Sequence, residues 1–319
     1  MESMEGTVLK GVGSFYTVRD ENGNDWILRC MKKVRRERLS PLPGDQVLFC
    51  PEMGEKENGR IPREPGGDRD LSREDGTGGE VAGWIEKVLP RKTLCLRPPV
   101  ANVTRLVIVL APMPEPDLLL ADRQIARAFA QHMEILIVVN KMELDPGLAA
   151  RLRNQYLGAE IPVFPVSALN RQGLEPLREA MQGALCCLTG QSGVGKSTLL
   201  NALLDLSLET GELSRKIDRG KNTTRHAELI EKDGLRIMDT AGFSLLEPEK
   251  AVPPEALKAR YPEFLPLEGK CRFRVCLHDR EPGCAVTNAV SEGMIHPERV
   301  ERYRVLLAEA REEWRDRYD

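Results

Sequence analysis

The N-terminal part of the chain alternates short apolar and polar stretches, with glycine, proline and asparagine between them. An alternation with period two predicts strands rather than helices. Five short strands within residues 6–98 predict a small barrel of the OB type, a fold that commonly binds single-stranded or irregular nucleic acid. The strands are expected at residues 7–9, 14–18, 26–30, 46–49 and 82–89.

From residue 103 onward, apolar runs alternate with helix-like segments. This alternation predicts an α/β domain with a mainly parallel sheet and helices on its faces. The pair Pro253-Pro254 predicts the exit from that domain. Strands are expected at residues 106–110, 135–139, 163–166, 184–189, 226–230 and 235–238, and helices at 125–130 and 197–204.

The composition limits the classes of function. The 319 residues are 41% hydrophobic and 30% charged, which is typical of a soluble globular protein of two or three domains. A formal net charge of −3 means that any nucleic-acid surface must be local. The longest apolar runs are too short to cross a membrane and no signal peptide opens the chain, so we expect a cytoplasmic protein with no membrane partner. The eight cysteines then indicate thiols or a metal site rather than disulfides.

A basic run follows the third predicted strand and contains Lys32, Lys33, Arg35, Arg36 and Arg38. Such a run is either a solvated loop or, on a barrel of this type, a contact for RNA. No feature of the chain indicates DNA. Residues 54–80 are rich in glycine and mixed charge but poor in apolar residues, so we expect a mobile insertion there.

Residues 190–197, GQSGVGKS, form a complete G-x-x-x-x-G-K-[ST] motif between a predicted strand and a predicted helix. Glycines let the backbone wrap a phosphate, so that its N–H groups and the helix N-terminus face the anion. Lys196 would reach the β/γ oxygens, and the Ser197 hydroxyl would ligate magnesium. The motif predicts a nucleoside triphosphate site.

Asp239 ends an apolar strand and begins the sequence D-x-x-G, which predicts a second part of that site. Its carboxylate would hold magnesium, and the backbone N–H of Gly242 would bond the γ-phosphate. The next residue is Phe243, whose ring cannot accept a hydrogen bond from water. Hydrolysis without a partner should therefore be slow.

The polar, basic segment 219–226 lies between the phosphate loop and Asp239. A threonine there can ligate magnesium and sense the γ-phosphate, which orders the loop in the triphosphate state. We favour Thr224, with Thr223 as its alternative. A plain basic loop is the other interpretation.

Residues 140–143, NKME, have the pattern by which GTPases read guanine, with glutamate in place of aspartate. Asn140 would bond the O6/N7 edge, Glu143 would accept from N1–H and N2–H, and the backbone at Ser167 and Ala168 would assist. The extra methylene of Glu143 shifts the carboxylate, so we expect guanine preference with a changed affinity. In the alternative, Glu143 only starts the next helix and another base is preferred.

The order of these motifs differs from that of an ordinary GTPase. There the guanine-reading element follows the phosphate loop, whereas here it precedes the loop by about 50 residues. All parts of a GTPase are present, but the chain has been cut and rejoined in a permuted order.

Three cysteines and a histidine lie within residues 271–284, in the spacing C-x4-C-x-H-x5-C. Soft thiolates and an imidazole in a closed set of four fit one structural tetrahedral zinc, whereas a catalytic zinc would need an open position. The alternative is three unrelated cysteines and a surface histidine. Lys270, Arg272 and Arg274 flank the first cysteine, so this segment could also face phosphate.

The candidate residues form four sets. The catalytic candidates are Lys196, Thr224 and Gly242. The nucleotide-binding candidates are Asn140, Lys141, Glu143, Ser167, Ala168, Gly190, Gln191, Ser192, Gly193, Val194, Gly195, Lys196, Ser197, Thr198 and Asp239. The magnesium ligands would be Ser197, Thr224 and Asp239. The zinc ligands would be Cys271, Cys276, His278 and Cys284.

Motif order and motifs together resemble the circularly permuted GTPases of bacterial ribosome assembly, the RsgA (YjeQ) family. The resemblance covers nearly the whole chain and rests on residues 97–103, RPPVANV, on the phosphate loop and on the Cys/Cys/His/Cys segment. It implies an OB-fold RNA-binding barrel at residues 1–98, a circularly permuted GTPase domain at 99–252 and a zinc-finger domain with C-terminal helices at 253–319. It further implies binding to the small ribosomal subunit and its rRNA late in maturation, with subunit-stimulated hydrolysis of GTP to GDP.

Three positions depart from the family's pattern. Glu143 replaces the usual aspartate, and Ala241 stands where many members have proline. Asn222 stands where the family often has a histidine that is suggested to position water. His226, four residues later, is either a substitute for that histidine or an ordinary residue at a strand start.

The expected mechanism is a nucleotide switch that a partner completes. GTP and magnesium would order residues 221–225 and 239–245, and docked RNA or ribosomal protein would complete the water-positioning site. We expect a monomer, because nothing in the sequence demands a dimer. One alternative is a nucleotide-gated RNA-binding module whose hydrolysis is incidental. Another is a nucleotide-dependent kinase, against which the sequence shows no acceptor site.

Overall fold

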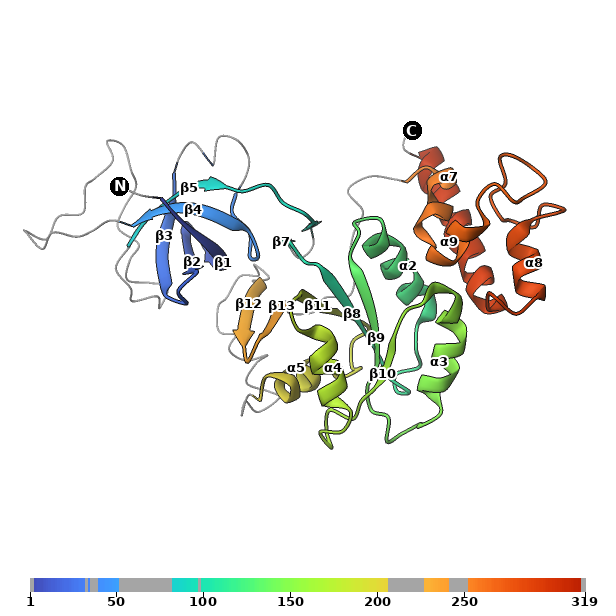
Figure 1. Ribbon diagram of the computed structural model, residues 1–319, viewed down its shortest axis with the longest axis horizontal. Coiled ribbons are helices and arrows are strands. Elements are labelled where there is room, and N and C mark those ends of the chain that lie inside the picture. Colours follow the sequence, from blue (N-terminus) through green and yellow to red (C-terminus); the bar gives the residue numbers. More distant parts are fainter. Residues whose placement is uncertain are drawn as a thin grey trace, which may run out of the picture. The chain divides into compact units, whose positions relative to one another are not determined.

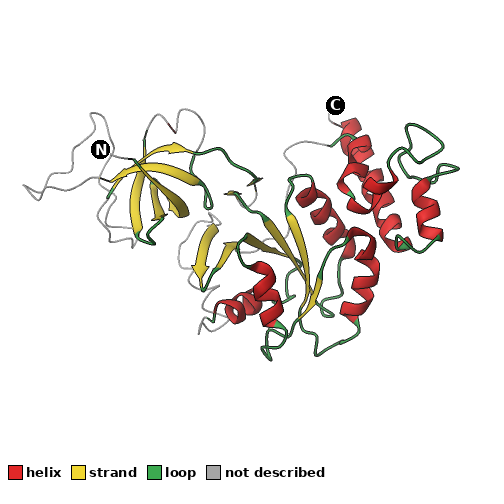
Figure 2. Ribbon diagram, in the orientation of Figure 1, coloured by secondary structure: helices red, strands yellow, loops and turns green. Residues whose placement is uncertain are grey.

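The computed structural model describes residues 3–31, 34, 40–51, 82–96, 99–205, 227–240 and 252–316. The chain divides into two compact units, Met1–Arg91 and Lys92–Asp319 (Figure 1). The first unit is built from strands, and the second combines a sheet with flanking helices (Figure 2).

The first unit is a closed five-stranded barrel in the order β1-β2-β3-β5-β4. Adjacent strands are antiparallel except β3 and β5, which pair in parallel. Inward-facing residues such as Val8, Val18 and Leu28 are fully buried and alternate with more exposed ones. This architecture confirms the predicted OB-type barrel. Its strands are β1 (Met4–Val12), β2 (Phe15–Asp20), β3 (Asp25–Cys30), β4 (Gln46–Pro51) and β5 (Gly83–Val88).

Two features predicted for this unit fall outside the described residues. They are the basic run at Lys32, Lys33, Arg35, Arg36 and Arg38 and the insertion at residues 54–80. Both stay predictions.

The second unit contains a six-stranded sheet in the order β10-β9-β8-β11-β13-β12. Among the described strands, β12 at one edge is antiparallel to its neighbour and the others pair in parallel. The central strands are buried along almost their whole length, as expected for a sheet covered on both faces. The strands are β8 (Arg105–Leu110), β9 (Glu134–Val139), β10 (Val163–Pro165), β11 (Leu185–Thr189), β12 (Ala227–Lys232) and β13 (Leu235–Thr240); β6 (Leu94–Leu96) and β7 (Pro99–Ala101) form a separate pair.

Helices cover both faces of this sheet (Figure 1). Helices α2 and α3 pack against β9 and β10, while α4 and α5 contact each other on the opposite face. The expected strand–helix alternation is therefore confirmed. The helices are α2 (Leu118–Phe129), α3 (Leu148–Tyr156), the short η1 (Leu157–Ala159), α4 (Leu174–Met181) and α5 (Lys196–Leu204).

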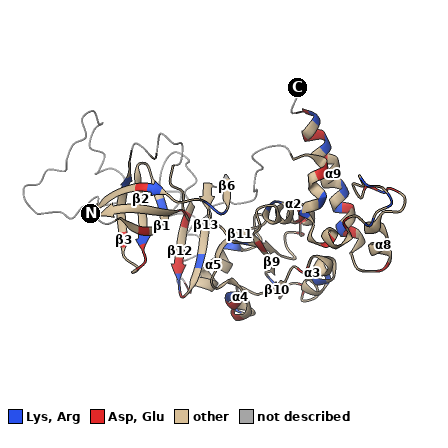
Figure 3. Ribbon diagram, turned by 45° about the horizontal axis from the view of Figure 1, so that its top comes forward, with Lys and Arg blue, Asp and Glu red and all other residues tan. Residues whose placement is uncertain are grey.

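Residues 252–316, here called the C-terminal module, combine helices with a loop at residues 268–284 and pack around three aromatic rings. The centroids of Tyr261, Phe264 and Tyr303 lie 4.9 to 5.1 Å apart. Charges of both signs alternate along α9 (Figure 3). Among the described residues, no helix combines the length and the apolar character that a membrane crossing requires. The elements are α7 (Pro254–Leu257), η2 (Lys258–Arg260), η3 (Pro262–Leu267), α8 (Ala285–Ser291) and α9 (Pro297–Asp316).

A buried group of charged residues joins this module to α2 and α3. The guanidinium of Arg299 on α9 is 1% exposed and lies 2.6 Å from Asp122 on α2 and 2.6 Å from Glu263 on η3. Arg302 donates to the second oxygen of Asp122 at 2.5 Å, and the hydroxyl of Tyr156 on α3 donates to Asp122 at 2.7 Å. Two cations thus face two carboxylates, and we call these five residues the docking cluster.

Charge balance within the docking cluster explains how it can be buried. Burial opposes the charge on Arg299, but Asp122 and Glu263 outweigh it and raise the pKa of Arg299 above its ordinary value. Removing one partner from such a group leaves an unpaired buried charge, at a cost of about 3–5 kcal/mol. The docking cluster therefore holds the C-terminal module against the helices beside the sheet.

Candidate functional site

The predicted nucleotide loops come together at one edge of the sheet. The phosphate loop follows β11, residues 140–143 follow β9, and Ser167 and Ala168 follow β10. These strands are parallel, so their carboxyl ends meet at the same edge, where open α/β sheets bind ligands. Along the chain, the base-reading loops after β9 and β10 come before the phosphate loop after β11. The permuted sequence order thus folds into one continuous site.

Glycines give the phosphate loop its shape. Gly190 has a φ of 141°, and a Cβ there would overlap the carbonyl oxygen of Val109 on β8. Gly195 has a φ of 89°, and a Cβ there would lie 2.5 Å from Nδ2 of Asn140. Both positions combine a positive φ with the close approach of another segment, strand β8 at Gly190 and the side chain of Asn140 at Gly195, so only glycine fits.

Lys196 is the first residue of α5 and folds back over the phosphate loop. Its ammonium donates to the carbonyl oxygens of Gly190 at 2.6 Å and Gln191 at 2.7 Å. Burial lowers the pKa of Lys196 below its ordinary value. The two carbonyl partners are dipoles, so they do not offset this effect as a carboxylate would. A phosphate would give Lys196 a charged acceptor in their place. The phosphate-binding role of Lys196 stays a prediction.

Asn140 connects the base-reading loops to the phosphate loop. Its side chain is buried, its Nδ2 donates to the carbonyl of Val194 at 2.9 Å, and its Oδ1 accepts from the N–H of Ala168 at 3.1 Å. The sequence predicted a contact of Asn140 with the base. The structure adds a positioning role, since one side chain fixes the spacing of three loops.

Lys141 and Gln191 make two further bridges whose roles the sequence did not predict. Lys141 donates from Nζ to the carbonyl oxygens of Gly193 at 2.7 Å and Met113 at 2.8 Å. Oε1 of Gln191 accepts from the backbone N–H of Asp117 at 2.9 Å, and Asp117 in turn caps the N-terminus of α2. An aspartate ahead of an apolar-periodic helix is a capping signal, but its bond to the phosphate loop has no local signature.

Glu143 and Ser167 lie in turns of the base-reading loops. Glu143 is exposed and precedes α3, which begins at Leu148, so it does not start that helix. The backbone of Ser167 pairs with Gln172, and its hydroxyl accepts from the N–H of Asn170 at 3.2 Å. Because Glu143 is exposed, its carboxylate is free to accept hydrogen bonds from the polar edge of a base.

The structure describes only some of the remaining candidates for the nucleotide site. Ser192, Val194, Ser197 and Thr198 lie in the phosphate loop or the first turn of α5, and Val194 is fully buried in the core. The candidates Thr224 and Gly242 fall outside the described residues, together with Thr223, Asn222, His226, Ala241 and Phe243. For Asp239, the backbone pairs with Glu228 at the end of β13.

The four predicted zinc ligands come together in the C-terminal module. Their ligand atoms lie within 4.8 Å of one another. Nδ1 of His278 is 3.7 Å from Sγ of Cys271, 3.5 Å from Sγ of Cys276 and 3.3 Å from Sγ of Cys284. A tetrahedral zinc with ordinary bond lengths would separate nitrogen and sulfur ligands by about 3.5 Å. The cluster is therefore compatible with zinc.

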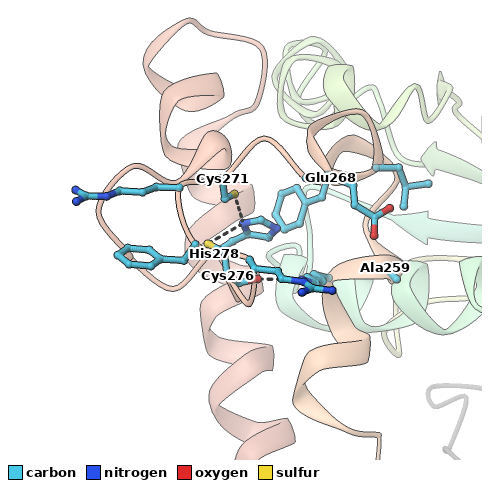
Figure 4. A pocket seen from close by; sticks show the side chains of 12 residues that line it. Ala259, Glu268, Cys271, Cys276 and His278 are labelled. Atoms are coloured by element: carbon cyan, nitrogen blue, oxygen red, sulfur yellow. Dashed lines mark hydrogen bonds between the residues drawn. The ribbon is translucent and has the colours of Figure 1, made fainter.

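The surroundings of this cluster hold the ligands in place. The N–H of Ala285 points at Sγ of Cys271 from 3.3 Å, and the ring of Phe264 stands edge-on to His278 at 5.3 Å. Burial lowers the pKa of His278, so its imidazole is neutral at pH 7, the form that ligates metals. Figure 4 shows Cys271, Cys276 and His278 turned toward one another.

Comparison with known proteins decides the family. The family model for the RsgA GTPase matches residues 88–249. The small ribosomal subunit biogenesis GTPase RsgA of Ruminiclostridium cellulolyticum is 39% identical over 93% of this chain and 91% of that protein. The relative of the same name from Moorella thermoacetica is 40% identical over 96% and 97%. This chain belongs to the RsgA GTPase family.

Solved structures of RsgA relatives share the fold. The crystal structure of YjeQ from Thermotoga maritima matches with a TM-score of 0.78 and 31% identity, over 97% of this chain and 99% of that one. YloQ, described as a circularly permuted GTPase, matches with a TM-score of 0.73 and 25% identity, over 98% and 96%. The predicted family, fold class, permutation and GTP hydrolase class are confirmed. The domain boundaries and the roles of individual residues stay predictions.

Proposed function

We propose that this chain hydrolyses GTP to GDP and phosphate during biogenesis of the small ribosomal subunit. In this proposal it binds that subunit and its rRNA in the cytoplasm, and the bound subunit accelerates hydrolysis. The observation that carries the proposal is the meeting of the phosphate loop and the base-reading loops at one sheet edge, in a chain of the RsgA GTPase family. The names of the relatives supply the small ribosomal subunit as the partner.

In the nucleotide site, Lys196 leaves its two carbonyl partners and contacts the β/γ oxygens of GTP. The loop N–H groups and the N-terminus of α5 face the phosphates. Asn140 and Glu143 read the guanine edge, with Ala168 held beside the base by its bond to Asn140. Thr224 and the N–H of Gly242 sense the γ-phosphate.

Two metal ions belong to the proposal. Ser197, Thr224 and Asp239 would hold magnesium, which would offset the charge of the phosphates. Cys271, Cys276, His278 and Cys284 would hold one structural zinc, and their spacing within 4.8 Å supports this assignment. Because the zinc set is closed, its role is to stabilise the fold of the C-terminal module.

In this proposal a partner is needed because the position after Gly242 holds no glutamine to orient water. The residue after Gly242 is Phe243, and Asn222 replaces a histidine that the family often has. A docked rRNA group or ribosomal protein would orient the attacking water. The docking cluster fixes the C-terminal module on α2, so a partner that binds this module would be linked through α2 to the domain that holds GTP.

The test is steady-state GTP turnover by the purified full chain, alone and with isolated small subunits, with large subunits and ATP as controls. We expect slow GTP turnover alone and an increase of at least about tenfold with small subunits, as for other partner-completed GTPases. Subunit binding without a change in turnover would instead support an RNA-binding module whose hydrolysis is incidental. A preference for ATP would contradict the assignment of Glu143.

A further inference from the structure

A pocket of about 310 Å³ lies beside the cysteine–histidine cluster. One wall is formed by the cluster residues Cys271, Cys276 and His278, and Figure 4 shows Glu268 and Ala259 across from them. The side chains of Phe264 and Leu265 line the pocket as well. Its size is at the lower end of the range for small-molecule sites, which suits a single planar group.

The rim of this pocket is basic and aromatic. Arg272, Phe273 and Arg274 are consecutive, exposed and part of the lining, and Phe273 is 46% exposed. Both Cys271 and Cys276 turn toward the cluster, so the residues between them bulge outward. Within the described part of the chain, neither arginine has a carboxylate partner. The guanidinium of Arg272 lies 5.7 Å from the centre of the Phe273 ring.

An exposed aromatic ring between two unpaired guanidinium groups is the chemistry that binds an unpaired nucleotide. Single-stranded RNA is bound by stacking its bases on aromatic side chains or guanidinium planes while cations contact the phosphates. We propose that this pocket binds one unpaired nucleotide of RNA, an inference that rests on the proposed function. The base stacks on Phe273 and enters the pocket, and Arg272 and Arg274 contact the flanking phosphates.

Glu268 distinguishes RNA from an acidic protein segment. A carboxylate in the pocket would repel an aspartate or glutamate side chain, whereas it accepts hydrogen bonds from the amino group of a base. The pocket therefore favours a ligand that carries anionic groups for the arginines of the rim and a hydrogen-bond donor for Glu268. A nucleotide has this distribution and an acidic peptide does not.

The experiment measures binding of a fluorescein-labelled, mixed-sequence, single-stranded 12-nucleotide RNA to the full chain by fluorescence anisotropy. Phe273→Ala should weaken binding about tenfold without changing its salt dependence, because stacking releases no counterions. Arg272→Gln combined with Arg274→Gln should weaken binding and reduce the slope of log K against log salt by about 1.4. Arg280→Gln and Met294→Ala, exposed positions of the same module outside the pocket lining, should leave binding unchanged.

A second measurement locates the nucleotide. RNA carrying 4-thiouridine, irradiated on the full chain, should crosslink to the peptide that holds Phe273, and mass spectrometry identifies that peptide. Zinc content and GDP affinity of each variant, both expected at the wild-type level, exclude misfolding as the cause of a loss.

Three outcomes would overturn the proposal. The first is RNA affinity of the variants equal to that of Arg280→Gln, and the second is crosslinking confined to the barrel. In the third, the variants bind RNA normally but no longer bind small subunits, which would indicate that the pocket binds a ribosomal protein. If RNA binds as expected while small subunits leave GTP turnover unchanged, the pocket stands and the proposed function fails.

Discussion

The nucleotide site and the cysteine–histidine cluster are assembled in opposite ways. The nucleotide site takes residues from loops after β9, β10 and β11, and side chains such as Asn140 and Lys141 tie those loops together through backbone carbonyls. The cluster takes its four candidate ligands from residues 271–284, so its assembly depends on the conformation of one short segment. A site made from distant loops depends on the whole sheet, whereas the cluster depends on one short segment and, in the proposal, on a zinc ion.

The two regions are connected by charge rather than by apolar packing alone. Arg299 and Arg302 of the C-terminal module meet Asp122 on α2, and the N-terminus of the same helix is bonded to Gln191 of the phosphate loop. Helix α2 thus contacts both regions. Substitutions can test three features separately. These are the docking cluster between α2 and the C-terminal module, the nucleotide site, and the contact that reads the base.

The largest expected effect comes from breaking the junction. Arg299→Met leaves Asp122 and Glu263 as buried carboxylates without their shared cation, and should lower the free energy of unfolding by about 3–5 kcal/mol. Urea unfolding followed by circular dichroism measures this change. Arg304→Met, which removes a cation paired with the exposed Glu301, should change it by at most about 1 kcal/mol. An equal loss in the free energy of unfolding for both variants would show that the docking cluster stabilises the fold no more than an exposed ion pair does.

The next largest effect isolates the nucleotide site. Lys196→Ala should reduce GTP turnover by about 100-fold to 1,000-fold, because a positioned cation for the phosphates is lost. Zinc content, measured by atomic emission on the same sample, should stay at one ion per chain. Lys232→Ala removes a lysine that bonds Leu204 and Asp205 instead, and should keep wild-type turnover. Wild-type GTP turnover in Lys196→Ala would contradict the role of the phosphate loop in hydrolysis.

A single methyl group tests whether the base-reading loops and the phosphate loop depend on each other. Gly195→Ala places a Cβ 2.5 Å from Nδ2 of Asn140 at a φ of 89°, so GDP affinity should fall at least about tenfold. Gly183→Ala is the matched control, since its φ is 71° but no atom lies within 4 Å of its Cβ. Fluorescent GDP titration should show a loss for Gly195→Ala alone. The same affinity in both variants would mean that contact with Asn140 is irrelevant to the site.

The smallest expected effect concerns the base-reading carboxylate. Glu143→Asp should bind GDP about twofold tighter, because aspartate loses less side-chain freedom on binding than glutamate. Glu143→Ala should reduce the ratio of GTP to ATP affinity, which competition titration measures. If that ratio were the same in Glu143→Ala and the wild type, Glu143 would have no part in guanine selection.

Local patterns in the sequence predicted most of this fold. The barrel strands, the strand–helix alternation and the cluster of Cys271, Cys276, His278 and Cys284 each have a short-range signature, and the structure contains all of them. The phosphate loop was equally clear, because its three glycines and Lys196 lie within seven residues of the chain.

Contacts between distant residues were not predictable in the same way. Asp122 and Arg299 look like ordinary surface charges on amphipathic helices, and only tertiary packing reveals that both are buried. The bond between Gln191 and the N–H of Asp117 depends on where β8 and β11 end. Periodicity predicts which face of a helix is apolar but not which charges will meet across an interface.

The most direct test of the account compares GTP turnover with small subunits before and after zinc removal. Chelated chain should keep wild-type GDP affinity and slow basal turnover, because the nucleotide site is built on the sheet. We predict that it loses the stimulation by small subunits, at least about tenfold in the intact chain, and regains it when zinc is restored. Full stimulation of the zinc-free chain would contradict the account, since the C-terminal module would then have no part in coupling the subunit to the nucleotide.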